Sequence, residues 1–596
     1  MRVALRAFLV FTGMAVVAGC SSVRSKTAES QIGFDPARWD GSVESQEQMR
    51  VNAVVSTGGL VVSDDREASE WGAEILRRGG NAVDAAVATA FALAVTRPHF
   101  AALGGGGFFL YCPKPVSGKP TSCEAIDYRE RAPAASKRDM YVRDGKPVSA
   151  LSRDGALAIG VPGVPAGLLL ALQRHGSMSR SKLLDKPIRL AKDGYRFTSH
   201  SEMAASQRWF AFNDEAKRIF GCGLEKEIKP CPVGTRIQQP ELAKVLEEIS
   251  QKGVNGFYQG WVADKIVAGL RSSGGIMSLE DLKSYRPVLR TPLEGDFRGM
   301  KVVTMPPPSA GGTMLLQMLG YVERASRTGQ LSEGFGAASS IHALTHAMSL
   351  SFADRAKYFG DPDHVRVPVQ ALLAPDYLDQ RWRTFDSAKV VIPDAAGEVP
   401  REGMHTTHFA VIDRDGNAVS VTTTVNEHFG SGFVPKGTGV VMNDEMDDFS
   451  SQPGVPNLFG LVGAEANAIA SGKRPLSSMT PVIVRDVQGN ARILLGAAGG
   501  PRITSSVFLT LVNRLHFGMS LPDAMGAPRF HHQWKPGKLR VERWGFAPDV
   551  LRKLTSLGYE LDIVATSARM QGLERFSNGR SWAAPDRRGE GAGAAE

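Results

Sequence analysis

The chain has 596 residues, of which 43% are hydrophobic and 22% charged. This composition is typical of a globular protein and excludes a disordered, a collagen-like or a multi-span membrane protein. The formal net charge is +9, but the 70 lysines and arginines are scattered among 61 acidic residues. Because they form no basic stripe with interleaved aromatic residues, nucleic-acid binding is disfavoured.

The first residues have the pattern of an export signal. Two arginines precede an apolar run, residues 7–19, which is too short to span a membrane as a mature helix. The run ends in Val-Ala-Gly before Cys20, which resembles a bacterial lipobox. We therefore expect residues 1–19 to be removed and Cys20 to carry lipid in the periplasm; an ordinary signal peptide is the alternative. Ser21 favours the outer membrane by the same resemblance.

The chain after the signal has a polar start and a long globular body. Residues 20–51 are rich in Ser, Glu and Gln and predict a flexible tether. A strand-like run over 54–62 precedes an alanine-rich helical pattern over 67–95 that is broken by a Gly-Gly pair. The glycines at 104–107 lack the Lys-Ser/Thr of a P-loop and run into an apolar strand, which favours close backbone packing. The Gly- and Ala-rich tail, 586–596, is predicted to be disordered.

Four further cysteines lie in two close pairs, Cys112 with Cys123 and Cys222 with Cys231. In an oxidising periplasm each pair predicts a local disulfide. A four-cysteine metal site is the alternative, and the absence of any Cys-x-x-Cys motif disfavours it.

Other catalytic motifs are incomplete. His342 and His346 have the spacing of a zincin helix, but Ala343 stands where the HExxH motif needs its glutamate. Two more histidine pairs lack supporting ligands and are expected to be structural or surface residues: His405/His408 and His531/His532. No GxSxG elbow occurs, which disfavours an α/β-hydrolase.

A hairpin is predicted in the second half of the chain. Two β-prone runs, residues 409–412 and 418–425, flank an Asp-Gly step, which is a strong hairpin signal. If the hairpin is centred on Asp415, Thr406 lies opposite Thr424 with Cβ atoms about 4.5–5.5 Å apart. Two hydroxyls would then converge. Threonine is common in strands, so the local pattern alone leaves a structural role open.

Several strings closely resemble γ-glutamyltranspeptidases. They are Thr406-Thr407-His408, the octapeptide NDEMDDFS at 443–450, RPLSSM at 474–479, Gly499-Gly500, Arg129-Glu130 and the opening segment 66–81. The resemblance extends over about residues 52–586. It implies an N-terminal-nucleophile hydrolase of the α+β class, a four-layer αββα sandwich, made as one precursor that cuts itself between His405 and Thr406. Residues 52–405 would belong to the large subunit and 406–596 to the small catalytic subunit.

The implied chemistry suits a threonine at a new chain end. A threonine hydroxyl is a weak nucleophile without a base, and cleavage gives Thr406 its own α-amine. The reference pKa of that amine is about 7.7–8.0, so a neutral fraction can accept the hydroxyl proton. The resemblance assigns Thr424 to a hydrogen bond with Thr406, and the backbone N–H groups of Gly499 and Gly500 to an oxyanion hole.

The resemblance also implies a γ-glutamyl donor, whose free end is a zwitterion. Its α-carboxylate would be bound by Arg129, Ser477 and Ser478, and its α-ammonium by Asn426, Glu445 and Asp448. The implied reaction is attack on glutathione or a related γ-glutamyl compound, with transfer of the acyl group to water or an amino-acid or peptide acceptor. No metal or organic cofactor is expected.

Two departures from the family pattern limit these expectations. Phe459 stands where many relatives have a lid tyrosine, and the late Gly-Ser-Thr-Gln-like element is altered at residues 568–572. Acceptor handling is therefore left open. Two other functions also stay open: a cephalosporin (glutaryl) acylase of the same fold, in which Asp448 would face no ammonium, and a non-catalytic lipoprotein scaffold.

Overall fold

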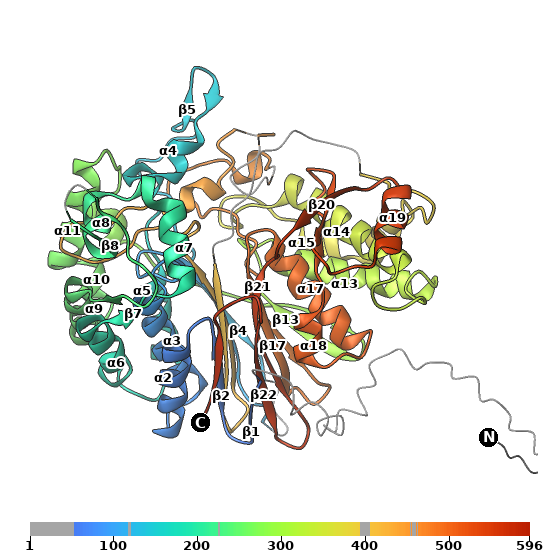
Figure 1. Ribbon diagram of the computed structural model, residues 1–596, viewed down its shortest axis with the longest axis horizontal. Helices are drawn as coiled ribbons and strands as arrows, with labels where there is room; N and C mark the ends of the chain where they lie inside the picture. Colours follow the sequence, from blue (N-terminus) through green and yellow to red (C-terminus); the bar gives the residue numbers. More distant parts are fainter. Residues whose placement is uncertain are drawn as a thin grey trace, which may run out of the picture.

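The computed structural model describes residues 53–116, 121–224, 227–393, 406–452, 454–455, 461 and 463–596. The predicted export signal, tether and lipid-modified Cys20 lie outside these residues, as do His405 and Phe459. Two seven-stranded sheets stack between two layers of helices (Figure 1). The predicted four-layer αββα sandwich is therefore confirmed. Within the described residues no helix is both long and apolar enough to cross a membrane.

Both sheets are antiparallel between all neighbouring strands. The first sheet has the order β11 (Val288–Arg290), β4 (Glu124–Asp127), β3 (Gly106–Cys112), β15 (Ala418–Thr424), β14 (Thr407–Ile412), β2 (Leu60–Ser63) and β23 (Ala592–Ala595). The second sheet has the order β1 (Val54–Ser56), β22 (Ser581–Pro585), β21 (Arg569–Arg575), β17 (Ala491–Ala498), β16 (Val482–Arg485), β13 (Met300–Thr304) and β12 (Leu293–Phe297). The run predicted as one strand over 54–62 is thus two strands, β1 and β2, in different sheets.

Helices cover the outer face of each sheet (Figure 1). On the first sheet's side are α2 (Arg66–Arg77), α3 (Ala82–Thr96), α5 (Val164–His175), α6 (Arg180–Asp193), α7 (Ser199–Arg208), α8 (Asp214–Phe220), α9 (Pro240–Lys252), α10 (Asn255–Tyr258), α11 (Gly260–Ser272) and α12 (Leu279–Lys283). On the second sheet's side are α13 (Gly311–Arg327), α14 (Ala338–Tyr358), α15 (Val369–Leu373), α16 (Pro375–Trp382), α17 (Arg502–Leu515), α18 (Leu521–Gly526) and α19 (Pro548–Ser556).

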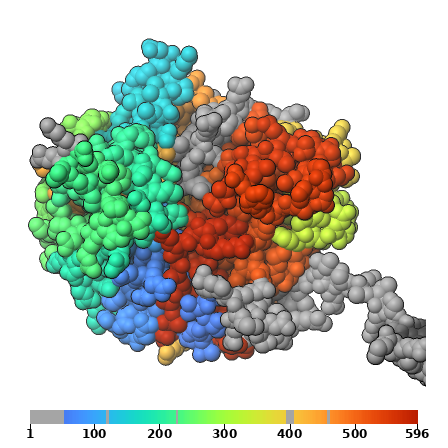
Figure 2. Space-filling view, viewed as in Figure 1, coloured from blue at the N-terminus to red at the C-terminus, as the bar shows by residue number. Residues whose placement is uncertain are grey.

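Several short elements lie outside the two main sheets and their helix layers. α4 (Ser149–Arg153) and the hairpin of β5 (Val142–Arg143) and β6 (Lys146–Pro147) project from the rim, where they are cyan in Figure 2. The remaining small sheets are β7 (Tyr195–Arg196) with β10 (Arg236–Ile237), β8 (Gly221–Cys222) with β9 (Lys229–Pro230), and β18 (Phe530–His531), β19 (Lys538–Glu542) and β20 (Glu560–Val564).

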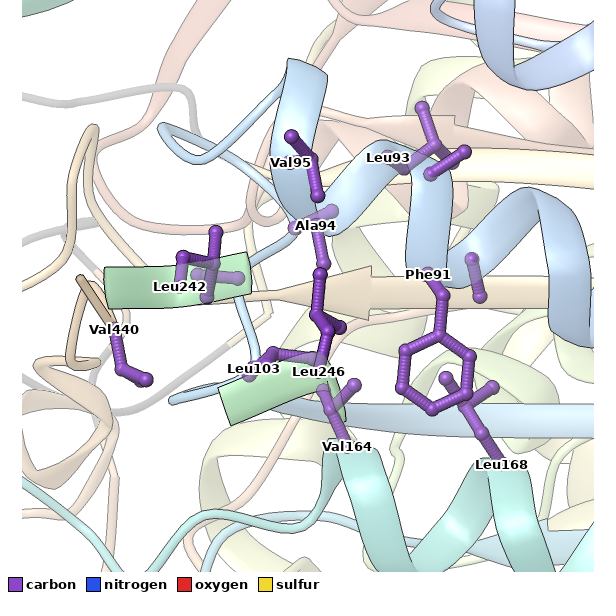
Figure 3. Packing of buried hydrophobic residues seen from close by; sticks show 14 of the residues in the cluster. Phe91, Leu93, Ala94, Val95, Leu103, Val164, Leu168, Leu242, Leu246 and Val440 are labelled. Atoms are coloured by element: carbon purple, nitrogen blue, oxygen red, sulfur yellow. The ribbon is translucent and has the colours of Figure 1, made fainter. Parts of the chain in front are cut away.

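The first helix layer is built around α3. All of its residues are buried, as expected for a helix that is apolar on every side. Figure 3 shows Phe91 of α3 close to Leu168 of α5, with residues of α9 packed beside the same helix. The break between α2 and α3 falls at the predicted Gly-Gly pair: Gly79 has a φ of +86°, and Asn81 caps α3 by accepting from the backbone N–H of Asp84.

Side chains of β14 alternate between two cores. Phe409 and Val411 pack in the cluster under the first helix layer, whereas Ala410 and Ile412 pack in the cluster shared with the second sheet. This is the period-two alternation of a strand that is buried on both faces. Even-numbered residues of β14 therefore face the second sheet.

The predicted hairpin and disulfides are confirmed. β14 pairs with β15 from Thr407↔Thr423 to Ile412↔Ala418, which is the register predicted by a centre at Asp415. Cys112 bonds to Cys123 across the β3–β4 hairpin, and Cys222 bonds to Cys231. The alternative of a four-cysteine metal site is therefore wrong.

The prediction of a disordered C-terminal tail is wrong. β23 pairs antiparallel with β2, and the Glu596 carboxylate accepts from the backbone N–H of Gly59 at 2.7 Å. In Figure 2 the red C-terminal part of the chain lies between the blue first helices and the orange segment. The Gly- and Ala-rich composition suggested disorder, but pairing with a neighbouring strand needs only backbone hydrogen bonds, which an Ala-Gly segment can also form.

Candidate active site

Two threonine hydroxyls meet where β14 begins and β15 ends. Thr406 precedes β14, and its hydroxyl donates to Thr424 Oγ1 at 3.4 Å. Both residues are buried, with 5% and 2% of their surfaces exposed. By the alternation of β14, Thr406 lies on the face turned toward the second sheet, as do His408 and Ala410. The convergence predicted from the hairpin register is confirmed.

The glycine stretch at 104–107 packs against the backbone of Thr424. A Cβ on Gly105 would lie 2.0 Å from the Thr424 carbonyl oxygen, and one on Gly104 would lie 2.2 Å from that of Val441. Glycine is required for this close approach. The predicted packing role is confirmed, and it has a local consequence: the backbone of Thr424 is held directly against the glycines.

The loop after β15 orients the Thr424 hydroxyl. Asn426 adopts a φ of +73°, and its backbone N–H donates to Thr424 Oγ1 at 2.8 Å. The Asn426 side chain donates to the Asp444 carbonyl at 3.1 Å. Further along, Asn443 donates to the carbonyls of Gly104 and Gly160 and accepts from the backbone N–H of Glu445 at 3.0 Å. Asn443 therefore fixes the start of the short 3₁₀ turn η4 (Glu445–Asp448).

The second sheet contributes a glycine pair at the end of β17. Gly499 and Gly500 have φ values of +145° and +55°, which L-residues with a Cβ rarely adopt. Gly500 lines the same pocket as Thr406, whereas Gly499, the other glycine predicted for the oxyanion hole, is not among the residues that line it. A Cβ on Gly499 would lie 2.9 Å from that of Ala568, so the altered segment 568–572 packs against this glycine.

One pocket brings together nearly all of the predicted site residues. They are Thr406, Thr424, Gly500, Arg129, Ser477, Ser478, Asn426, Glu445 and Asp448. They lie at or just beyond the ends of β4, β14, β15 and β17, on η4, and on the loop that carries the serine pair. The sandwich thus gathers at one rim residues that are up to 371 positions apart in the sequence.

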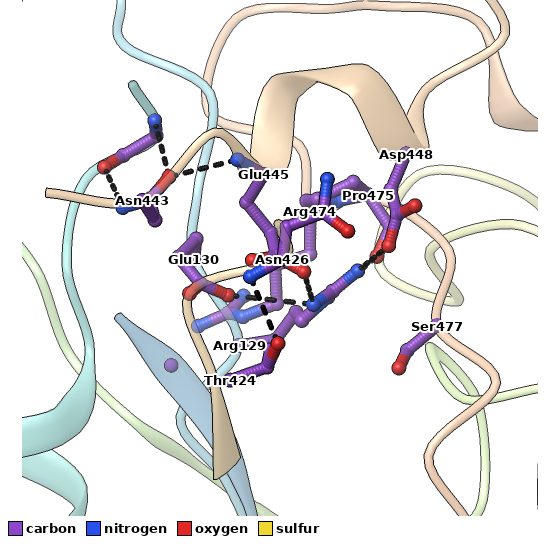
Figure 4. Close-up of polar contacts among 12 residues, drawn as sticks. Arg129, Glu130, Thr424, Asn426, Asn443, Glu445, Asp448, Arg474, Pro475 and Ser477 are labelled. Atoms are coloured by element: carbon purple, nitrogen blue, oxygen red, sulfur yellow. Dashed lines mark hydrogen bonds and ion pairs between the residues drawn. The ribbon is translucent and has the colours of Figure 1, made fainter. Parts of the chain in front are cut away.

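Arg129 is the centre of the polar part of this pocket (Figure 4). Its guanidinium donates to the carboxylates of Glu445 and Asp448, and Glu130 lies 3.6 Å away. It also donates to the Pro475 carbonyl at 3.2 Å. The groups predicted to bind opposite ends of a zwitterion are therefore paired with each other in this arrangement.

Burial and charge shift the pKa values of these groups in a consistent way. Burial raises the pKa of Glu445 and of Asp448, although Arg129 opposes both shifts. Burial likewise raises the pKa of Glu130 to about 7. For Arg129, burial would lower the pKa, but the three carboxylates outweigh it and raise the pKa above its usual value. The guanidinium therefore stays charged at any physiological pH.

The serine pair lies on a loop that is hydrogen-bonded to the proline-rich turn at residues 306–308. The Ser477 N–H donates to the Pro308 carbonyl, and the Ser477 carbonyl accepts from the N–H of Ala310, both at 2.9 Å. The Ser478 hydroxyl is buried and has no hydrogen-bond partner in the described structure. That hydroxyl is therefore a donor open to a ligand in the pocket.

Sequence reasoning missed several lining residues. Arg355 of α14 is 4% exposed, lines the pocket, and burial lowers its pKa to about 10. The apolar wall is formed by Leu461, Leu476, Met479, Pro501 and Ile503. No local pattern marks Arg355, because it sits among the ordinary polar residues of a long helix.

The histidines set aside in the sequence analysis have structural contacts. His342 bonds to the Tyr559 hydroxyl at 2.8 Å and to the Asp386 carbonyl, and His531 bonds to the Ser505 hydroxyl. His408 contacts Thr422 Oγ1 at 2.9 Å. Across the described ranges no cluster of three His, Cys, Asp or Glu side chains is arranged to hold a metal ion.

Comparison with known proteins agrees with this geometry. The family model described as Gamma-glutamyltranspeptidase matches residues 68–596. A relative named glutathione hydrolase proenzyme, from Escherichia coli (strain K12), is 41% identical over 540 residues, which is 89% of this chain and 90% of the relative.

Solved structures show the same fold. The cephalosporin acylase from Bacillus halodurans matches with a TM-score of 0.76 and 26% identity, over 92% of this chain and 97% of that one. The γ-glutamyltranspeptidase from Helicobacter pylori matches with a TM-score of 0.51 and 38% identity, over 55% of this chain and 91% of that one. With the paired threonines, the glycine turn and the arginine-centred pocket, these matches establish that the chain belongs to the γ-glutamyltranspeptidase family.

Proposed function

We propose that the protein is a γ-glutamyltransferase and glutathione hydrolase whose nucleophile is Thr406. The observation that carries the proposal is one buried pocket that holds the Thr406 and Thr424 hydroxyls, Gly500, and a charged cluster with both signs around Arg129. A hydroxyl nucleophile, an amide donor for a developing oxyanion and a zwitterion site are the parts that hydrolysis of a γ-glutamyl amide requires.

The first reaction would be self-cleavage of the precursor. The Thr406 hydroxyl attacks the His405 carbonyl carbon, the new C–O bond replaces the C–N bond, and the hydroxyl proton passes to the released amine. Water then hydrolyses the ester and frees the two chains. Each later catalytic cycle uses the same Thr406 hydroxyl oxygen as nucleophile, and the α-amine of Thr406 is then the neighbouring base. The large and small subunits would remain together as a heterodimer.

In turnover, Thr406 Oγ1 attacks the γ-carbonyl carbon of the donor and its proton moves to the α-amine. The tetrahedral oxyanion lies near the N–H of Gly500. When the C–N bond breaks, the leaving amine takes that proton, and an acyl-enzyme remains. Water or the amine of an amino acid or peptide then attacks the ester by the reverse path.

The charged cluster would recognise the donor by exchange of partners. In the structure Arg129 forms ion pairs with Glu445 and Asp448. A donor's α-carboxylate would bind Arg129 and the serine hydroxyls, while its α-ammonium would bind the two carboxylates that Arg129 releases. Because a zwitterion brings one charge of each sign, the net charge of the cluster does not change, and both Arg129 and the carboxylates gain an oppositely charged partner.

Asp127 is a positioning residue for this cluster. Its Oδ1 accepts from the backbone N–H of Arg129 at 2.9 Å, and its Oδ2 accepts from Arg290 at 3.1 Å and lies 3.7 Å from Arg474 Nε. Arg474 begins the loop that carries Pro475 and the serine pair. One buried carboxylate thus ties the arginine and the serines, which lie on opposite sides of the proposed cut, into one site.

The second candidate is a glutaryl acylase. It is favoured by the match to a cephalosporin acylase, and it would use the same nucleophile. A glutaryl group carries a carboxylate but no α-ammonium, so Glu445 and Asp448 would remain buried without a cationic partner once Arg129 bound the carboxylate. This imbalance disfavours it.

The protein is also proposed to be exported and anchored to the membrane through Cys20, with an outer-membrane location favoured by Ser21. The support is the signal-like sequence of residues 1–19 and its resemblance to a lipobox. The two disulfides fit an oxidising compartment.

Thr406→Ala should remain a single uncut chain without γ-glutamyl activity, because the attacking oxygen is gone. The wild type should give two bands on a denaturing gel, for residues 20–405 and 406–596, with Thr406 as the first residue of the smaller fragment. Thr407→Ala is the matched control, since its side chain faces the other side of the sheet, and it should be cut normally. An uncut wild type would support a scaffold, and cleavage of the Thr406→Ala variant would refute self-cleavage.

Donor selection can be tested with two anilides that differ only in the α-ammonium group. We expect kcat/KM for L-γ-glutamyl anilide to exceed that for glutaryl anilide by about 100-fold, because a charged hydrogen bond to a buried group is worth about 1.5–3 kcal/mol. Glutaryl-7-aminocephalosporanic acid serves as a third substrate. A preference for either glutaryl compound would reverse the choice between the two candidates.

Asp127→Asn should raise KM for the γ-glutamyl donor about tenfold, equivalent to about 1.4 kcal/mol, and should leave kcat within about threefold. The charge that aligns Arg129 and Arg474 is lost, while the nucleophile is untouched. Asp84→Asn is the control, because Asp84 is equally buried and accepts from backbone N–H groups near Ser177, away from the pocket. A loss confined to kcat, or the same KM change in the control, would contradict this role.

Cys20→Ser should move the protein from the detergent-extracted membrane fraction to the soluble periplasmic extract, with unchanged γ-glutamyl activity per molecule. The reason is that acyl chains contribute about 0.8 kcal/mol per buried CH₂ to membrane binding. Wild-type protein recovered wholly in the soluble extract would rule out the anchor.

A further inference from the structure

The glycine pair at the end of β17 poses a physical problem for catalysis. Gly499 and Gly500 allow the backbone to approach the nucleophile closely, but glycine also permits many other backbone conformations. The peptide between them could rotate with little steric cost. An oxyanion donor is effective only when its N–H is already aimed at the place where charge develops. Some contact must therefore hold this peptide in one orientation.

Arg502, the first residue of α17, makes that contact. Its Nε donates to the Gly499 carbonyl at 3.2 Å, and its backbone N–H donates to the same oxygen at 3.2 Å. The side chain is buried, with 4% of the residue exposed. Burial lowers the pKa of Arg502 to about 10, so the guanidinium remains charged near neutral pH.

Peptide geometry turns this contact into control of the N–H direction. The peptide between Gly499 and Gly500 is trans, so its C=O and N–H bonds point in opposite directions. When the Gly499 oxygen is held toward Arg502, the Gly500 N–H is directed away from it. Gly500 lines the pocket that contains Thr406, so a Gly500 N–H held in one orientation is fixed at the edge of that pocket.

The guanidinium also changes the strength of the donor. A cation that donates to a peptide carbonyl withdraws electron density from the whole amide, which makes its N–H a stronger donor. The positive end of the α17 dipole acts in the same sense. Arg502 therefore polarises the peptide as well as orienting it.

The first turn of α17, which carries the Arg502 side chain, is itself held in place. In the first turn of α17 the Thr504 hydroxyl donates to the Ser478 carbonyl at 3.2 Å, and the Ser505 hydroxyl bonds to His531 at 2.8 Å. The helix start is thus tied to the serine loop on one side and to β18 on the other. Because the start of α17 is held in this way, the long Arg502 side chain can define the position of the Gly499–Gly500 peptide.

We propose that Arg502 is a positioning residue for the reaction, which holds and polarises the Gly499–Gly500 peptide so that the Gly500 N–H stabilises the tetrahedral oxyanion. This inference rests on the proposed function. Arg502 itself does not touch the substrate, and its effect belongs to the transition state rather than to donor binding.

The test compares Arg502→Lys and Arg502→Met with Arg514→Met, which removes another arginine of the same helix, one that is partly buried and paired with Glu574. On the processed enzymes, kcat for L-γ-glutamyl anilide and the inhibition constant of L-glutamate are measured. The affinity of a boronic acid analogue of glutamate, which becomes tetrahedral on Thr406, gives a transition-state readout. Thermal unfolding reports the fold of each variant.

Both Arg502 variants should lose about 10–100-fold in kcat. This loss is smaller than, or at most similar to, the loss of kcat when a whole oxyanion donor is removed. Boronate affinity should fall in parallel, while the L-glutamate inhibition constant stays within about threefold and Arg514→Met behaves as wild type. If Arg502→Met does not fold, the Lys variant carries the test.

A kcat within about threefold of wild type in a folded Arg502 variant would overturn the inference and leave the proposed function standing. An equal loss of L-glutamate affinity would also overturn it, because the variant would then have distorted the whole pocket. A wild-type enzyme without γ-glutamyl turnover would overturn the proposed function, and this inference with it.

Discussion

The site depends on the register and alternation of one strand pair. Because side chains along β14 alternate between faces, Thr406 points toward the second sheet only if its parity matches that of Ala410 and Ile412, which pack there. A shift by one residue would turn Thr406 toward the helices and bring Thr407 to the pocket. The buried apolar residues of β14 fix the register on both faces, and so they also fix the nucleophile.

The geometry of the candidate active site depends on backbone conformations and close backbone contacts that only glycine permits. Gly105 allows the first sheet's glycine stretch to touch the Thr424 backbone, and Gly499 and Gly500 turn the end of β17 toward the nucleophile. Such flexibility must be offset by contacts that select one conformation. Asn443 does this for the loop behind Thr424, and Arg502 does it for the glycine turn.

The charged part of the pocket follows a different principle. Arg129 is fully buried with three carboxylates close by, an arrangement that costs several kcal/mol in desolvation for each ion unless the partners neutralise one another. Glu445 and Asp448 pair with the Arg129 guanidinium, burial raises the pKa of all three carboxyl groups, and Asp127 with Arg290 and Arg474 extends the network outward. A zwitterion can replace the internal pairing at little net electrostatic cost. A singly charged ligand cannot.

The sequence by itself determined the local features: the helical pattern before Thr96, the β14–β15 hairpin with its register, the close cysteine pairs and the glycines. Each depends on neighbours a few residues apart, for which periodicity and turn chemistry are reliable. The resemblance to a known family added the αββα fold and the site residues. Tertiary structure alone decided which strands meet, because β23 and the separation of β1 from β2 depend on partners hundreds of residues away. It also decided that Arg355 lines the pocket, that Arg129 pairs with Glu445 and Asp448, and that Arg502 holds Gly499, since contacts between distant segments leave no local pattern in the chain.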